Sequence, residues 1–318
     1  MKAIVLERPG STENFVYKEV PQPVIALNEV LIKVEYISIN PVDIKTRKGG
    51  GVYEYANLDP AKELIPGWDI AGTVMESHSG LFKQGDDVFG MVNFIGIGAA
   101  YAEMVAAPAS HLALKPDNIT FSEAAAATLA ALTAWQNVVN IAKIKAGDRV
   151  LIHAAAGGVG HYAVQIAKHF GAYVIGTSSA ENKNFVLSLG ADEHIDYKSQ
   201  ALADNVKVVD FVLESLDNES IIKSLDVIKS GGRLISLLSA ISPEAKNLAD
   251  ARSISIENTA VSSNGADMNS IAKLLQSGAI RSYISRTFAF NDMALAHDQI
   301  ESGRTVGKVV VKVQMQGW

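Results

Sequence analysis

A glycine-rich turn between two apolar runs is the feature whose spacing most directly indicates chemistry. Residues 149–154 predict a strand, and residues 159–177 predict an amphipathic helix followed by a second strand. The turn has the spacing Ala155-x-Gly157-x-x-Gly160. In such a turn Gly157 lets a pyrophosphate approach the backbone, and Gly160 lets the helix lie close to the sheet. The order of elements predicts a dinucleotide-binding βαβ unit, although a glycine-rich turn can also serve packing alone.

The end of the second strand bears on the choice between NAD and NADP. NAD-binding units usually carry Asp or Glu about 20 residues after the glycines, where the carboxylate binds the ribose hydroxyls. Here the strand ends in Thr177-Ser178-Ser179, and Lys183 follows. These residues lack a carboxylate that would repel a 2′-phosphate, and they add hydroxyl donors and a positive charge. We therefore expect NADPH as cofactor, although the serines could cap a helix and Lys183 could be a surface charge.

Composition and charge limit the classes of function. With 318 residues, 48% of them hydrophobic, the chain can bury a large core and predicts two domains. A net charge of −6 argues against nucleic acid as a partner, and no apolar run is long enough to span a membrane. The charged opening residues 1–8 predict a strand rather than a signal peptide. The absence of cysteine excludes disulfides and suits a cytoplasmic enzyme.

The pattern of the chain changes near residue 120, and the change predicts an α/β protein. Earlier residues form short β-like runs separated by prolines, which favours a β-barrel domain at residues 1–121. A helix is predicted from Ser122 to about Ala142, and strands then alternate with helices. This pattern predicts a Rossmann domain with a doubly wound parallel sheet at residues 122–287. The final residues, 288–318, return to β character and are expected to complete the barrel.

Besides the glycine turn, several short motifs follow one another in an order typical of one known family. They are Asn40-Pro41-Val42-Asp43, Pro66-Gly67-Trp68-Asp69-Ile70-Ala71-Gly72, Gly85-Asp86-Asp87-Val88-Phe89-Gly90, Ala100-Tyr101-Ala102-Glu103, Leu132-Thr133-Ala134, Leu189-Gly190-Ala191-Asp192, Ile195-Asp196-Tyr197, Gly231-Gly232-Arg233-Leu234 and Gly307-Lys308-Val309-Val310. In these motifs the chain resembles the zinc-independent quinone oxidoreductase (zeta-crystallin-like) branch of the medium-chain dehydrogenase/reductases. That resemblance implies a GroES-like β domain, a Rossmann domain and a nicotinamide cofactor in the cleft between them; we also expect a homodimer.

The motifs also indicate chemistry without a metal. Zinc-dependent relatives carry a cysteine near the position of Ser38–Asn40 and Gly-His-Glu where this chain has Gly67-Trp68-Asp69. The seven histidines are scattered without metal-ligand spacing, so we expect no metal site. Hydride can pass without a Lewis acid to an acceptor whose product anion is delocalised, such as a quinone or an α,β-unsaturated carbonyl.

The resemblance assigns roles to individual residues. Asn40 would face the nicotinamide and the substrate, and Tyr53 falls about where the family carries a substrate-facing tyrosine. Lys183 and Tyr197 would hold the 2′-phosphate. The full set of expected cofactor-binding residues is Thr133, Ala156, Gly157, Gly158, Val159, Gly160, Ser178, Ser179, Lys183, Tyr197, Leu238 and Lys308.

The predicted function is therefore an NADPH-dependent reductase of quinones or α,β-unsaturated carbonyls. Two alternatives stay open. The chain could be a 2-alkenal or enone double-bond reductase rather than a quinone reductase, or a non-catalytic NADPH-binding protein. The proton donor, the role of His161 and the contacts of the loop Glu214–Asn218 do not follow from the sequence.

Overall fold

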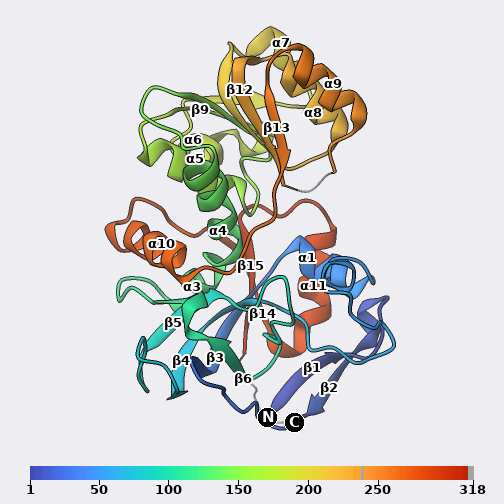
Figure 1. Ribbon diagram of the computed structural model, residues 1–318, viewed down its shortest axis with the longest axis vertical. Helices are drawn as coiled ribbons and strands as arrows, with labels where there is room; N and C mark the ends of the chain where they lie inside the picture. The colour runs from blue at the N-terminus through green and yellow to red at the C-terminus, as the bar shows by residue number, and fades with distance from the viewer. Residues whose placement is uncertain (238–239, 314–318) are drawn as a thin grey trace. The chain divides into compact units, whose positions relative to one another are not determined.

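The computed structural model describes residues 1–237 and 240–313, which form two compact units (Figure 1). Unit 1 comprises Met1–Leu132 together with the chain from Ser262 onward, and unit 2 comprises Thr133–Val261. The predicted Rossmann domain also included residues 122–132 and 262–287, which these contacts place in unit 1. Within unit 1, helix α10 (Gly265–Ser277) packs against strand β7 (Leu112–Leu114), and Met268, Ile271 and Leu275 of this helix are buried.

Unit 1 is built around a mainly antiparallel sheet with the strand order β14-β15-β3-β4-β5-β7, and β6 also pairs with β3. Strand β15, from the end of the chain, pairs with β3 and so completes the sheet, as the sequence predicts. Strands β1 and β2 form a separate antiparallel pair. The strands are β1 (Lys2–Leu6), β2 (Phe15–Glu19), β3 (Glu29–Ile39), β4 (Asp69–Ser77), β5 (Asp87–Met91), β6 (Met104–Pro108), β7, β14 (Ile284–Ala289) and β15 (Lys308–Lys312).

Helices and short turns connect the strands of unit 1. Helix α3 packs on β3 and β4, and α11 packs against α1 and β15. The helical elements are η1 (Thr12–Asn14), α1 (Pro41–Arg47), α2 (Val52–Tyr55), η2 (Ala109–His111), α3 (Phe121–Ala126), α10, η5 (Phe290–Asp292) and α11 (Met293–Glu301); α4 (Leu129–Trp135) spans the boundary with unit 2.

The predicted continuous helix from Ser122 to about Ala142 is wrong. The chain forms α3, then α4, then η3 (Gln136–Ile141), which has π-helical hydrogen bonding. Thr120 caps α3 by accepting a hydrogen bond from the Glu123 N–H at 3.2 Å. Between the helices, the Asp69 carboxylate accepts a hydrogen bond from the Leu129 N–H at 3.1 Å. A distant side chain therefore caps the start of α4, and alanine-rich periodicity contains no signal for that break.

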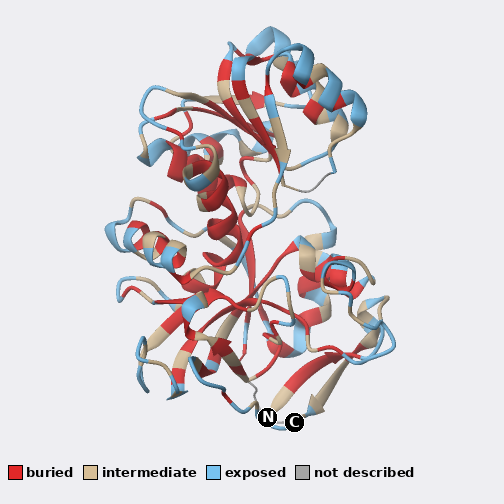
Figure 2. Ribbon diagram, viewed as in Figure 1, coloured by how far each residue is buried: buried red, intermediate tan, exposed pale blue. Residues whose placement is uncertain are grey.

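Unit 2 contains a fully parallel sheet with the strand order β10-β9-β8-β11-β12-β13. Numbered within the unit this is 3-2-1-4-5-6, the order of a dinucleotide-binding Rossmann sheet. Its central strands β8, β9 and β11 are largely buried, and helices cover the sheet (Figure 2). The elements are β8 (Arg149–Ile152), α5 (Gly160–His169), β9 (Tyr173–Ser178), η4 (Ala180–Asn182), α6 (Lys183–Ser188), β10 (Glu193–Asp196), α7 (Leu202–Asn205), β11 (Val209–Glu214), α8 (Asn218–Leu225), β12 (Ile228–Ser236), α9 (Pro243–Ala251) and β13 (Ser255–Asn258).

Candidate cofactor and active site

The glycine turn joins β8 to α5 with very little space between helix and strand. Ala154 takes a left-handed conformation with φ 46° at the start of the turn. A Cβ atom at Gly160 would lie 2.2 Å from the Ala154 carbonyl oxygen, so only glycine fits where α5 begins. At Gly157 the corresponding distance to the same oxygen is 3.1 Å. The turn therefore has the close backbone packing that the spacing of its glycines predicts.

The start of α5 offers backbone donors for an anion. Among the described residues, the N–H groups of Gly158 and Val159 have no hydrogen-bond acceptor. His161, whose role the sequence did not indicate, is buried and its Nδ1 lies 2.9 Å from the Gly157 carbonyl oxygen. The ring therefore donates to that carbonyl and fixes the turn. Free N–H groups at a helix N-terminus are suited to a phosphate.

The hydroxyl groups at the end of β9 have different surroundings. Thr177 is buried, and its Oγ1 lies 3.1 Å from His153 Nδ1, so this hydroxyl is used inside the protein. The Ser178 hydroxyl donates to the Ser179 carbonyl oxygen at 3.1 Å. The Ser179 hydroxyl accepts a hydrogen bond from the Asn182 side chain at 3.2 Å. Of these three residues, only Ser178 and Ser179 remain candidates to bind a 2′-phosphate at the end of β9.

Lys183 and Tyr197 lie on the two segments that flank the end of β9. Lys183 is the first residue of α6 and is exposed, and its side chain has no hydrogen bond or ion pair within the described part of the chain. Tyr197 follows β10 and is 61% exposed. Its backbone N–H donates to the Ser178 carbonyl oxygen at 3.2 Å, which holds it beside the strand end. Of the residues expected at a 2′-phosphate, the backbone thus brings Ser178 and Tyr197 together.

A histidine that the sequence analysis did not select also lies here. His194 is half-buried on β10, and its Nε2 is 2.7 Å from Ser178 Oγ. Burial and the positive charge of Lys183 lower the pKa of His194, while Asp196 opposes them. The pairing register of β10 with β9 is what brings this side chain to the site. Strand register is a tertiary property, so the sequence alone did not indicate that His194 lies beside Ser178.

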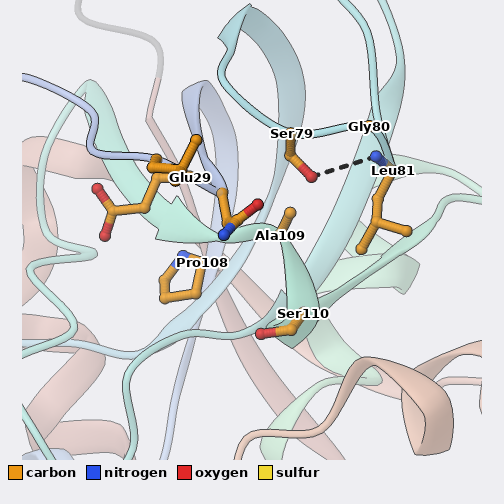
Figure 3. Close-up of a pocket in the computed structure, with 9 residues that line it drawn as sticks. Glu29, Ser79, Gly80, Leu81, Pro108, Ala109 and Ser110 are labelled. Carbon is orange, nitrogen blue, oxygen red and sulfur yellow. Dashed lines mark hydrogen bonds between the residues drawn. The ribbon is translucent and has the colours of Figure 1, made fainter.

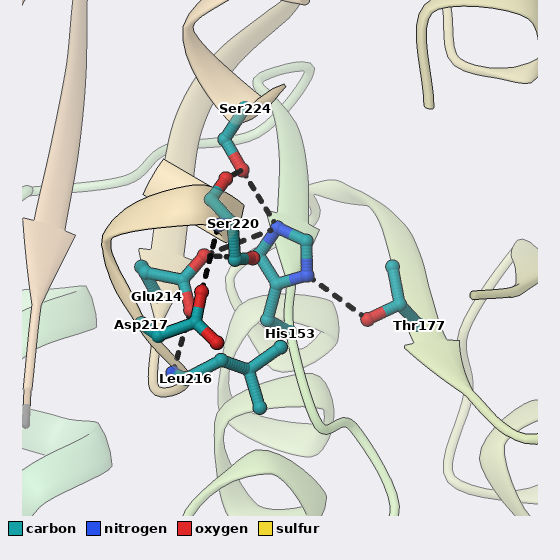
Figure 4. A network of polar contacts seen from close by, with 7 residues as sticks. All are labelled: His153, Thr177, Glu214, Leu216, Asp217, Ser220 and Ser224. Carbon is teal, nitrogen blue, oxygen red and sulfur yellow. Dashed lines mark hydrogen bonds and ion pairs between the residues drawn. The ribbon is translucent and has the colours of Figure 1, made fainter. Parts of the chain in front are cut away.

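A buried polar network lies at the adjacent strand ends (Figure 4). The Ser224 hydroxyl donates to the Ser220 carbonyl oxygen at 2.8 Å and lies 2.8 Å from His153 Nε2. Because that hydroxyl proton is used, His153 donates from Nε2 and accepts from Thr177 at Nδ1. The Glu214 carboxylate, 3.5 Å from His153, accepts from the Leu216 N–H at 2.6 Å and the Ser220 hydroxyl at 2.7 Å. The Glu214 carboxylate therefore stabilises the loop that follows β11.

Burial shifts the pKa values of both titratable groups in this network toward the neutral form. It lowers the pKa of His153 to about 4 and raises that of Glu214 to about 7. Near neutral pH the histidine is uncharged, so its contact with Glu214 is not an ion pair. The network is a hydrogen-bonded support for this edge of the sheet, in which His153 is uncharged and Glu214 titrates near neutral pH.

In unit 1, Asn40 and Lys308 come together in a buried cluster. The amide of Asn40 donates to the Asp69 carboxylate at 2.8 Å, and its oxygen accepts from the Lys308 ammonium. Lys308 also donates to the Ile39 carbonyl oxygen at 3.1 Å. Asn40 and Lys308 are only 1% and 3% exposed. Their polar groups bind one another here, and their contacts with substrate and cofactor stay predictions.

Two carboxylates accompany this cluster. Burial raises the pKa of Asp69 and lowers that of Lys308, and their mutual attraction opposes both shifts. Burial, with the nearby charge of Asp69, raises the pKa of Asp43 to about 7. Asp43 accepts a hydrogen bond from the Asn40 N–H at 2.7 Å, which caps α1.

The remaining expected site residues have varied surroundings. Tyr53, on α2, is 5% exposed, and its hydroxyl oxygen is buried without a hydrogen-bond partner among the described residues. Thr133 is buried on α4, and its carbonyl oxygen accepts from the Asn137 side chain at 2.8 Å. Ala156 is buried within the glycine turn. Leu238 lies outside the described residues.

A pocket in unit 1 lies away from the expected site residues of that unit (Figure 3). Glu29, at its edge, begins β3, whereas Asn40 follows the last residue of that 11-residue strand, about 30 Å along it. The Glu29 carboxylate accepts from the Ala26 N–H at 2.8 Å. The lining residues are Leu27, Asn28, Glu29, Ser79, Gly80, Leu81, Pro108, Ala109 and Ser110.

The described residues contain neither a metal-ligand cluster nor a membrane-spanning helix. No group of three or more His, Asp or Glu side chains in them could hold a metal ion. None of the helices there is both long enough and apolar enough to cross a membrane.

Comparison with known families gives two matches. Residues 26–117 match the family described as "Alcohol dehydrogenase GroES-like domain", and residues 189–311 match "Zinc-binding dehydrogenase". The first match lies in unit 1, and the second covers parts of both units.

Individual proteins match over nearly the whole chain. The quinone oxidoreductase of Sus scrofa is 32% identical, covering 98% of this chain and 97% of the relative. The "NADPH-dependent alkenal/one oxidoreductase, chloroplastic" of Arabidopsis thaliana is 33% identical, covering 91% and 73%. The solved quinone oxidoreductase of Coxiella burnetii is 34% identical with a TM-score of 0.90, covering 99% of both chains.

The Glu214 network predicts a pH-dependent effect of Glu214→Gln. A carboxyl group whose folded pKa is raised from 4.5 to about 7 stabilises the fold below pH 4.5, and this contribution is lost as pH rises to 7. Relative to wild type, the variant's free energy of unfolding should therefore increase by up to about 3 kcal/mol between pH 4.5 and 7. Urea denaturation across this range measures the difference. Glu219→Gln, at an exposed carboxylate on α8, is the control; a difference that does not vary with pH would contradict the prediction.

Proposed function

The chain belongs to the zinc-independent, quinone oxidoreductase-like branch of the medium-chain dehydrogenase/reductase family, and from this premise we propose that it is an NADPH-dependent reductase. It transfers hydride to a quinone or to an α,β-unsaturated carbonyl without a metal. The observation that carries the proposal is the end of β9, where serine hydroxyls and the unpaired Lys183 replace a carboxylate.

The residues present fit an NADPH molecule. The free N–H groups of Gly158 and Val159 would bind the pyrophosphate at the start of α5. Ser178, Lys183 and Tyr197 would bind the 2′-phosphate by hydrogen bonds and charge. When bound, NADPH supplies the hydride.

The acceptor requires a hydrogen-bond donor toward the oxygen on which negative charge develops. Tyr53 is the better candidate in unit 1, because its hydroxyl has no protein partner within the described residues. Asn40 has its amide committed to Asp69 and Lys308, which supports a positioning role for it. Buried hydroxyls without partners are uncommon, and a substrate oxygen would satisfy this one.

Location and assembly extend the proposal. We expect a cytoplasmic homodimer, consistent with a chain that lacks cysteine. The relative from Arabidopsis thaliana is named as chloroplastic, so location varies among similar proteins. Light scattering on the purified chain measures the assembly, and a monomer mass of 33.9 kDa would contradict a dimer.

The proposal predicts NADPH oxidation in the presence of quinones or enones. Product analysis would separate quinone reduction from reduction of a carbon–carbon double bond, the leading alternative. Activity should survive a chelator, because the chain contains no thiolate ligand. Binding of NADPH without turnover on any acceptor would favour a non-catalytic NADPH-binding protein, and activity that needs added zinc would exclude the metal-free reaction.

Tyr53→Phe should lower kcat/KM for the acceptor by about tenfold to a hundredfold, because a donor to the developing oxyanion is lost. The dissociation constant for NADPH should not change. Tyr55→Phe is a matched control, since Tyr55 lies on the same short helix and is 64% exposed. Equal kinetics in the two variants would remove Tyr53 from the active site.

Cofactor preference is tested at Lys183. Lys183→Ala should raise the KM for NADPH about tenfold, since a charge-assisted hydrogen bond is lost from an exposed site, while the KM for NADH should barely change. Ser178→Asp should shift preference toward NADH, because its carboxylate would repel the phosphate and accept from the ribose hydroxyls. Steady-state kinetics with both cofactors measure these effects. An equal loss for both cofactors in Lys183→Ala would contradict the assignment.

A further inference from the structure

The end of β9 and the segment formed by β10 and Tyr197 meet at Ser178 in unit 2. His194 Nε2 lies 2.7 Å from Ser178 Oγ, and the Tyr197 N–H donates to the Ser178 carbonyl oxygen at 3.2 Å. In the parallel register, His194 pairs with Gly176 and Asp196 with Ser178, so His194 and Asp196 lie on the same face of β10. The histidine is therefore in direct contact with a residue of the proposed 2′-phosphate site.

The charged groups at this site balance a phosphate only in part, although Lys198 Nζ lies 5.9 Å from the centre of the Tyr197 ring. The charged groups facing His194 are Lys183 from α6 and Asp196 from its own strand. The Asp196 carboxylate accepts hydrogen bonds from the Ser199 hydroxyl at 2.6 Å and the Lys198 N–H at 3.2 Å, so it caps the following turn. Lys183 and Asp196 together contribute no net charge. A 2′-phosphate brings about −1.5 to −2 charges at neutral pH.

We propose that His194 is a specificity-determining residue for NADPH, which takes up a proton when the 2′-phosphate binds and donates a hydrogen bond to it. The inference rests on the proposed function, because it concerns the same phosphate site. The imidazolium adds a positive charge to those of Lys183 and Lys198. NADH brings no phosphate to this position, so its binding leaves His194 uncharged.

The half-buried environment makes this proton uptake a consequence of binding. Before NADPH binds, burial and the charge of Lys183 hold the pKa of His194 below its usual value, with Asp196 opposing them. A bound phosphate dianion favours the charged imidazole and raises that pKa. The contribution of His194 to NADPH affinity is therefore greatest at low pH. This contribution is lost as pH rises through the pKa of His194 in the complex.

The test is isothermal titration calorimetry of NADPH and NADH in buffers of different ionisation enthalpy between pH 6 and 8. His194→Gln is the informative variant, because glutamine can still reach Ser178 but carries no charge. His169→Gln, at an exposed histidine near the end of α5, is the matched control. The 2′-phosphate itself titrates near pH 6, so the difference between wild type and His194→Gln isolates the histidine.

We expect wild type and His169→Gln to take up more protons with NADPH than His194→Gln does. His194→Gln should bind NADPH about three- to tenfold more weakly at pH 6.5 and close to normally at pH 8, with NADH unchanged. Tighter binding of NADPH than NADH, with equal proton uptake in wild type and His194→Gln, would overturn the role of His194 alone. Binding of NADPH no tighter than NADH at any pH would overturn the NADPH preference and this inference together.

Discussion

The buried ammonium of Lys308 is the contact on which the sheet of unit 1 depends. It binds the Ile39 carbonyl oxygen and the amide of Asn40, which in turn holds Asp69. Asp69 also caps α4 through the Leu129 N–H. A buried charge without partners is very costly, so each member of this cluster fixes the positions of the others. The start of α1, the start of β4 and the start of β15 are thereby held in one arrangement.

In unit 2 a different constraint gathers the functional groups. All strands of its sheet are parallel, so their carboxyl ends face the same edge. The glycine turn follows β8, Ser178 ends β9 and Glu214 ends β11, while His194 lies within the adjacent β10. Groups next to the proposed phosphate site thus differ in burial, and with burial their protonation differs. The hydrogen-bonded His153–Glu214 pair supports the edge with an uncharged imidazole, while the half-buried His194 can still change its charge.

Periodicity and glycine spacing predicted both the parallel sheet and the return of β15 to the first domain, because these patterns depend on local sequence. The break between α3 and α4 could not be predicted in this way, since its cap comes from Asp69, some sixty positions earlier. His194 was missed for the same reason: its neighbour Ser178 is set by strand register. The resemblance assigned Asn40 a role beside nicotinamide and substrate, which stays a prediction, and only the fold places Lys308 against it, 268 positions away.

That separation has a consequence for the chain while it is being made. Asp69 and Asn40 leave the ribosome long before Lys308, which lies 239 residues after Asp69 (308 − 69). At about 5–20 residues per second, translation needs roughly 10 to 50 s to cover this interval. During that time β3 lacks β15 as its neighbour. The carboxylates of Asp43 and Asp69 also lack the ammonium of Lys308. Unit 2 is contiguous and can fold first, so the nascent first domain passes through a period with an open sheet edge that invites pairing with other chains.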